Sequence, residues 1–299
     1  MTTVYSTYIT YWDNDPYAQV QDMISKQVIL PTTRVILAFA SFNFASPVYI
    51  PGLGALTIQQ VQQLVELVHT VHATISLSIG GATYPFAGSD LYTQPGLLAE
   101  NINEIVQTCG FDGIDFDIED AAANVPSNFA NQAASLINTL RSLNSTLLIT
   151  LTTAAQAWAP GTYQLPLLNL TIGNLTAWQP MEYDLWVDPS STYTAQIQYD
   201  INYYLTTWGV SPMKLILGLM PGRDDTSKDL TLQDALNLTA FAKEKGLQGV
   251  MTWDANNDGK GCDGNAPYAY SMGIQSMLSP TEIKYDRNRH RKRSIVPIV

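Results

Sequence analysis

Short apolar segments rich in β-branched and aromatic residues recur along the chain at intervals of 30 to 40 residues. They predict strands at residues 4–11, 34–41, 73–79, 113–118, 147–153, 177–183, 214–220 and 249–253. Apolar residues with helical spacing predict helices at residues 17–27, 57–69, 96–108, 127–143, 194–208 and 232–245, with Ser127 and Thr231 as two of their N-caps. Residues 154–176, interrupted by proline and asparagine, predict only a short helix. This alternation of strand and helix is typical of a parallel sheet in the α/β class.

The number of these units favours one architecture. Eight of them in about 280 residues match a closed (β/α)8 TIM barrel, in which the reactive side chains gather at the C-terminal ends of the strands. An open doubly wound sheet is the alternative. It is disfavoured because the first strand is followed by YWDNDP at residues 11–16, where that fold carries a glycine-rich phosphate loop. We therefore predict a single barrel domain over residues 1–280.

Charge is distributed unevenly along the chain. The formal net charge is −11, yet six of the fifteen basic residues lie between positions 284 and 293. Residues 1–283 then hold nine basic and 25 acidic residues, a net charge of −16. A body this acidic repels phosphate backbones, so nucleic acid is not an expected partner. Residues 281–299 are predicted to form a basic, disordered tail, with an address, a processing site or an interaction segment as the alternatives.

Membrane and export signals are not predicted. No apolar run reaches the length of about 18 residues that a membrane-spanning helix needs. Residues 1–12 lack the basic start and apolar stretch of a signal peptide. Two cysteines, Cys109 and Cys262, are too few for a disulfide framework or a metal cluster.

The most informative segment is FDGIDFDIED at residues 111–120. Side chains alternate along a strand, so Asp115, Asp117 and Glu119 share one face. Three acids pointing into a barrel interior are unfavourable unless they hold a cation, share a proton or form a structural hydrogen-bonded cluster. The shared proton fits acid catalysis, because one carboxyl then stays protonated to higher pH. Glu119, the last and longest of the three, is predicted to lie nearest the barrel mouth as the proton donor.

This segment resembles the D-G-x-D-x-D-x-E signature of glycoside hydrolase family 18, the chitinase-like enzymes. Other landmarks resemble the same family in the same order along the chain. They are SLSIGG at residues 76–81 with Gly80 and Gly81, MEYD at residues 181–184 with Tyr183 and Asp184, and Trp253 at the end of the eighth strand. The resemblance spans residues 76 to 254 by motif, and the strand count extends it over nearly the whole chain.

The resemblance implies a retaining mechanism in which the substrate supplies the nucleophile. Glu119 would protonate the glycosidic oxygen while the carbonyl oxygen of the substrate's 2-acetamido group attacks the anomeric carbon, giving an oxazolinium ion. Asp117 would orient the acetamido group, and Asp115 behind it would share the proton. Tyr183 would hydrogen-bond the acetamido oxygen. The remaining matched residues would bind substrate: Trp253 as an apolar floor, and Asp184, Gly80 and Gly81 around it.

The implied substrate is a β-1,4-linked N-acetylglucosamine polymer, chitin or its oligosaccharides. We expect a monomer without cofactor or metal, and such a substrate favours an extracellular site of action. Alternatives are an endo-β-N-acetylglucosaminidase acting on N-glycan cores, a non-catalytic chitin-binding lectin on the same barrel, and a cation-dependent enzyme. The M-x-Y-D form and Trp253 favour a chitinase, and the intact Glu119 disfavours a lectin.

Some residues depart from this pattern or stay unassigned. Glu182 occupies a position that is more often small or neutral in the family, and strand alternation predicts that it points away from the site. Residues 254–259 resemble the start of a calcium loop, but Asn265 replaces the bidentate glutamate at the twelfth position, so a polar turn is predicted. Several aromatic residues near strand ends could stack on sugars without an assigned subsite: Trp12, Phe42, Tyr84, Trp158 and Trp186.

Overall fold

The computed structural model describes residues 3–44, 50–54, 56–121, 123, 125–159 and 161–279. The predicted basic tail at residues 281–299 lies outside the described residues. Within the described residues, no helix is long and apolar enough to cross a membrane. Cys109 and Cys262 are both free thiols.

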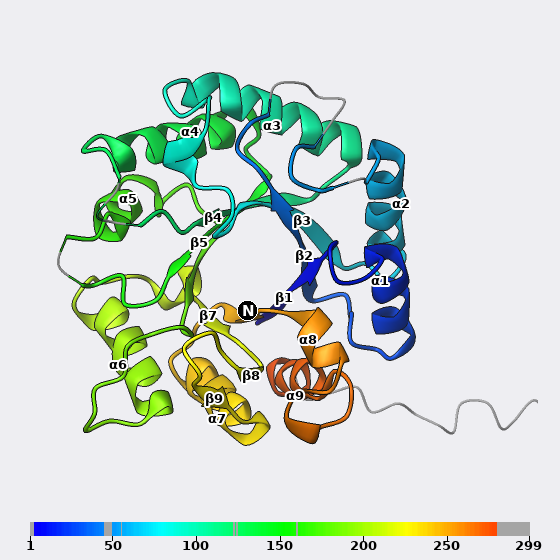
Figure 1. The fold of residues 1–299 in the computed structure, drawn as a ribbon, viewed down its shortest axis with the longest axis vertical. Helices are drawn as coiled ribbons and strands as arrows, with labels where there is room; N and C mark the ends of the chain where they lie inside the picture. Colours follow the sequence, from blue (N-terminus) through cyan, green and yellow to red (C-terminus); the bar gives the residue numbers. More distant parts are fainter. Residues whose placement is uncertain are drawn as a thin grey trace, which may run out of the picture.

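Eight parallel strands close into a barrel at the centre of the molecule, as the sequence predicts (Figure 1). Their order around the barrel is β1-β10-β7-β6-β5-β4-β3-β2, so that β1 pairs with both β2 and β10. The strands are β1 (Val4–Thr10), β2 (Thr33–Ala40), β3 (Thr74–Gly80), β4 (Gly113–Ile118), β5 (Leu148–Ala154), β6 (Ala177–Met181), β7 (Ile216–Leu219) and β10 (Gly249–Thr252).

Helices surround the barrel as an outer layer (Figure 1). They are α1 (Pro16–Ser25), α2 (Ile58–His69), α3 (Pro95–Cys109), α4 (Phe129–Leu143), α5 (Gln164–Thr171), α6 (Tyr193–Thr206), α7 (Leu232–Glu244), α8 (Ala255–Gly259) and α9 (Ala269–Leu278). Single 3-10 turns form at Phe86–Gly88, Pro212–Lys214 and Cys262–Gly264. A two-stranded antiparallel hairpin, β8 (Gly222–Arg223) and β9 (Asp229–Leu230), follows β7.

Two predicted helix caps have different outcomes. The Thr231 side chain accepts a hydrogen bond from the Asp234 backbone N–H at 3.2 Å, so the prediction of this cap is confirmed. The prediction for Ser127 is wrong, because α4 begins one residue later, with Asn128 as an N-cap that makes no side-chain hydrogen bond. A turn bond from the Phe129 backbone N–H to the Pro126 carbonyl precedes that helix and shifts its start.

The hydrophobic core lies between the strands and the helices. Ile114, Phe116 and Ile118 on β4 are fully buried there and belong to the main apolar cluster. A full burial of this kind stabilises the fold by about 1.5–3 kcal/mol per side chain. The alternate β4 positions therefore face the barrel interior, which is where the sequence pattern places the acids.

Candidate active site

Asp115 is fully buried inside the barrel and is held by side chains from four other strands. Its carboxyl oxygens accept hydrogen bonds from the hydroxyls of Tyr8 and Ser78 (both 2.7 Å), Thr150 (2.6 Å) and Thr152 (2.9 Å) and from the Gln179 amide (3.2 Å). Burial raises the pKa of Asp115, while the bonds from Thr150 and Tyr8 act in the opposite direction. Asp115 is thus fixed beneath the cleft described below.

Asp117 lies one step nearer the barrel mouth on the same face. It is 2% exposed, and its Oδ1 makes no hydrogen bond within the described part of the chain. Burial raises the pKa of Asp117 well above its usual range, and the negative charges of Glu119 and Asp115 raise it further. Asp117 therefore tends to keep its proton and has one oxygen available for a bound group.

Glu119 follows the last residue of β4 and reaches the mouth of the barrel. Burial raises the pKa of Glu119 to about 7; a hydrogen bond from the Ala82 backbone lowers it, and the Asp184 charge raises it. A general acid works best when its pKa lies near the working pH. Glu119 is thus suited to donate a proton near neutrality.

Gly80 is the last residue of β3 and Gly81 follows it, beside these acids. The Gly81 backbone N–H donates to the Asp117 carbonyl oxygen at 2.9 Å, which ties the two strand ends together. A Cβ on Gly81 would stand 2.7 Å from the Phe39 ring. The two glycines support the wall from behind, and the residues after them, Ala82 to Tyr84, line the cleft itself.

Tyr183 and Asp184 form the wall that follows β6. Burial, followed by the charges of Asp117 and Glu119, raises the pKa of Tyr183 well above its usual range, so its hydroxyl stays neutral. Asp184 adopts a left-handed backbone with φ of 53°. Its Oδ1 accepts from the Asp225 backbone N–H at 2.7 Å, and its own N–H donates to Asp224 Oδ2 at 3.0 Å. Asp184 thereby fastens this wall to the β8–β9 hairpin.

Trp253 forms an apolar floor together with two neighbouring rings. It stacks on Phe39 with ring centroids 5.3 Å apart at 17°, and it meets Tyr8 edge-on at 5.2 Å. Trp12, half exposed, stacks on the same Phe39 ring at 6.0 Å. Such flat aromatic surfaces fit the apolar face of a sugar ring.

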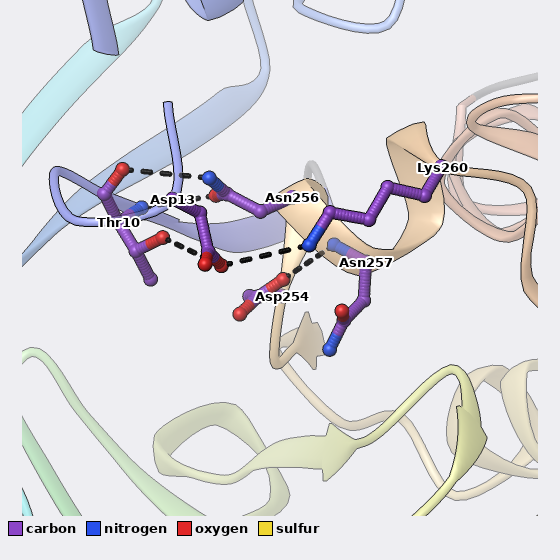
Figure 2. A network of polar contacts seen from close by, with 6 residues as sticks. All are labelled: Thr10, Asp13, Asp254, Asn256, Asn257 and Lys260. Atoms are coloured by element: carbon purple, nitrogen blue, oxygen red, sulfur yellow. Dashed lines mark hydrogen bonds and ion pairs between the residues drawn. The ribbon is translucent and has the colours of Figure 1, made fainter. Parts of the chain in front are cut away.

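A polar network joins the end of β1 to the segment that directly follows Trp253 (Figure 2). Asn256 accepts from the Thr10 backbone N–H at 3.0 Å and donates back to the Thr10 carbonyl at 3.4 Å. Asp254 accepts from the Asn257 backbone N–H at 2.7 Å and caps α8. The prediction of a polar turn at residues 254–259 is therefore wrong, because these residues form the N-cap and the whole of the short helix α8. Lys260 adds an ion pair to Asp13 at 3.8 Å.

A cleft of about 560 Å³ opens at these strand ends. Of the predicted site residues, five line it: Asp117, Glu119, Tyr183, Asp184 and Trp253. Of the unassigned aromatics, Trp12 and Tyr84 line it as well. Sequence reasoning missed Gln156, Leu185 and Asp225, which stand on loops after strands and carry no motif. Within the described ranges, no group of three His, Cys, Asp or Glu side chains is placed to hold a metal ion.

Comparison with known proteins gives the same assignment. The sequence profile of glycosyl hydrolases family 18 matches residues 5–231. A chitinase of Enterococcus faecalis is 28% identical in an alignment of length 185 that covers 54% of this chain and 53% of that protein. The chain thus spans about half the length of this curated relative.

Solved structures with the same fold include a family 18 chitinase from Pseudoalteromonas aurantia. It has a TM-score of 0.73 at 20% identity and covers 92% of this chain and 100% of its own. A catalytic-site mutant of active domain 2 of the Pyrococcus furiosus chitinase, complexed with chito-oligosaccharides, has a TM-score of 0.74 at 15% identity over 93% and 95%.

The closed barrel with carboxyl groups at the end of β4 is the architecture of a glycoside hydrolase. The chain belongs to glycosyl hydrolases family 18, as its motifs indicate.

Proposed function

We propose that this protein hydrolyses β-1,4-linked N-acetylglucosamine polymers by substrate-assisted catalysis. The observation that carries the proposal is the contrast between two acids on one face of β4. Glu119 stands at the cleft mouth with a pKa near 7, whereas Asp117 is buried and its pKa is raised well above its usual range. A protonated Asp117 is a poor nucleophile, so the substrate's own acetamido oxygen takes that part.

In the first step Glu119 gives its proton to the glycosidic oxygen as the bond from that oxygen to C1 breaks. The acetamido carbonyl oxygen bonds to C1, and the electron pair of the broken bond leaves with the protonated sugar alcohol. Asp117 orients the acetamido N–H, and the neutral Tyr183 hydroxyl donates to the acetamido oxygen. In the second step the Glu119 carboxylate takes a proton from water, and that water oxygen bonds to C1 and opens the oxazolinium ring.

The floor and the relatives support the same substrate class. Trp253 and Phe39 stack on each other in the cleft that Asp117 and Glu119 also line, and such an aromatic surface suits the apolar face of a sugar ring. The Enterococcus faecalis relative is named a chitinase, and a Cycas revoluta chitinase with the same fold is described in complex with (GlcNAc)4.

The test is hydrolysis of chitotetraose and of a fluorogenic chitobioside by the wild type and by Glu119→Gln, with a chelator present. We expect turnover by the wild type and a loss of roughly a hundredfold or more in the variant, as for removal of a general acid. Glu100→Gln, an exposed site on α3, is the matched control and should keep full activity.

Two further outcomes separate the alternatives. Fully deacetylated chitotetraose should not be cleaved, because it lacks the acetamido nucleophile; its rapid cleavage would contradict the mechanism. Turnover of an N-glycan core without turnover of chitotetraose would indicate an endo-β-N-acetylglucosaminidase. Binding of chitotetraose without any turnover would indicate a lectin.

A further inference from the structure

Glu182 is a buried acid directly beside the site that the mechanism above does not use. It stands between Met181, the last residue of β6, and Tyr183, and its backbone N–H donates to the Gly218 carbonyl of β7 at 3.0 Å. Strand alternation turns its side chain away from the cleft, as the sequence predicts, and there it is fully buried. A buried carboxyl needs a partner or a proton.

Its neighbour is a second buried acid, Asp200 of α6. The Asp200 Oδ1 accepts from the Trp158 indole N–H at 2.8 Å and from the Gln196 amide at 3.0 Å. Three remaining carboxyl oxygens, both of Glu182 and Oδ2 of Asp200, make no hydrogen bond of regular geometry within the described residues. Burial and then the Asp200 charge raise the pKa of Glu182 well above its usual range. One proton between the two carboxyls pairs two of these three oxygens, and the Tyr204 hydroxyl is a further hydrogen-bond partner for Glu182.

We propose that Glu182 and Asp200 share a proton as an acid pair that positions the β6 and β5 walls of the cleft. The proposal rests on the function proposed above. On one side the pair fixes the backbone that carries Tyr183. On the other side it fixes Trp158 in the β5–α5 loop, next to the cleft residue Gln156.

Further contacts hold the same loop at the two residues that precede Trp158. The Tyr204 hydroxyl on α6 accepts from the Ala157 backbone N–H at 3.2 Å. The Gln156 amide donates to the Trp186 carbonyl at 2.6 Å and its carbonyl accepts from the Trp186 N–H at 3.2 Å. If the acid pair were loosened, the resulting displacement would therefore reach Gln156 and Tyr183, which both line the cleft.

The titratable groups that act on Glu182 are Asp200, Tyr204 and Tyr193, all on α6, and none of them is a base. None of these groups is a cation that could neutralise the second negative charge if Glu182 and Asp200 were both ionised. The pKa of Glu182 is raised in the folded state, so the stability that its proton contributes is complete at acidic pH. That contribution is lost as the pH rises toward the folded pKa.

The experiment compares Glu182→Gln and Glu182→Leu with the wild type, with Glu244→Gln at an exposed site on α7 as the control. Glutamine keeps a donor for Asp200 and does not titrate, whereas leucine offers no donor to Asp200 Oδ2. The melting temperature of each protein is measured from pH 5 to pH 9, and kcat and KM on chitotetraose are measured at pH 6.

The glutamine variant should lose less melting temperature than the wild type between pH 5 and pH 9 and should keep kcat/KM within about twofold. The leucine variant should lose roughly tenfold in kcat/KM, as displaced cleft groups would. The control should follow the wild type. Equal pH dependence for wild type and Glu182→Gln, or equal activity of the two Glu182 variants, would overturn the acid pair. The melting series does not require turnover, so a failed chitinase assay is distinguishable from a failed acid pair.

Discussion

Gly80 lies so close to Asp117 that a Cβ atom on Gly80 would stand 2.0 Å from the Asp117 carbonyl oxygen. The contact comes from the backbones of β3 and β4, so no side-chain rotation can relieve it. Gly80 also has a φ of 118°, a region that other residues rarely adopt. The glycine is therefore required by the close approach of the ends of β3 and β4, and β4 carries the acids proposed for catalysis.

We expect Gly80→Ala to destabilise the fold by about 3 kcal/mol, because both strain and overpacking act at the same site. The displaced Asp117 should also lower activity in whatever folded protein remains. Urea unfolding gives the free energy. Gly96→Ala is the matched control, since a Cβ there meets no atom within 4 Å in the first turn of α3. It should be neutral or stabilising by up to about 1 kcal/mol; equal losses in both variants would contradict the argument.

The shared face of the acids on β4 could be predicted from the sequence, because side chains alternate along a single strand. The partners of Asp115 could not. Tyr8, Thr150 and Gln179 come from β1, β5 and β6, and only the register of the closed barrel brings their side chains to one carboxyl. No local pattern encodes that register.

The same limit applies to the cleft loops and to the last helices. Gln156 and Asp225 line the cleft through the path of their loops, which depends on bonds such as that from the Asp225 N–H to Asp184. Helix α8 is too short to show a period. Helix α9 contains Gly273, which packs closely against Leu236 of α7. In the sequence alone, a glycine at such a position indicates a helix break.

The pH dependence of hydrolysis should follow the protonation of Glu119. The first step needs its protonated form, and burial raises the pKa of Glu119 to about 7. The kcat on chitotetraose should therefore be maintained at mildly acidic pH and fall about tenfold per pH unit well above pH 7. An unactivated substrate is needed, because a fluorogenic leaving group departs with less help from an acid. A profile that stays flat to pH 9 would exclude Glu119 as the proton donor.

The variant Tyr183→Phe should distinguish the contribution of the hydroxyl from that of the ring. The ring remains to fill its buried place, and the hydroxyl close to Asp117 and Glu119 is lost. We expect kcat to fall by roughly a hundredfold, as for loss of a donor to a developing charge, with a small change in melting temperature. Tyr84→Phe is the control, since Tyr84 also lines the cleft and its hydroxyl makes a long hydrogen bond of 3.5 Å to the Gly52 carbonyl. An unchanged kcat in Tyr183→Phe would place the hydroxyl outside the reaction.

Asn256→Ala should weaken the contact between the end of β1 and α8, next to the aromatic floor formed by Trp253. Asn256 is 2% exposed and bonds the backbone N–H and carbonyl of Thr10, which joins the end of β1 to the first turn of α8 (Figure 2). Removing both bonds leaves two backbone groups without their partner, so the free energy of unfolding should fall by about 2 kcal/mol. The KM for chitotetraose should rise because Trp253 is less firmly held.

Asn257→Ala is the neighbouring control for this contact. Asn257 contributes its backbone N–H to the Asp254 cap, and that bond survives the substitution (Figure 2). Its free energy of unfolding should stay within about 0.5 kcal/mol of the wild type. If the two variants lose equal stability, or if KM does not respond in Asn256→Ala, the network holds α8 alone and does not position the floor of the cleft.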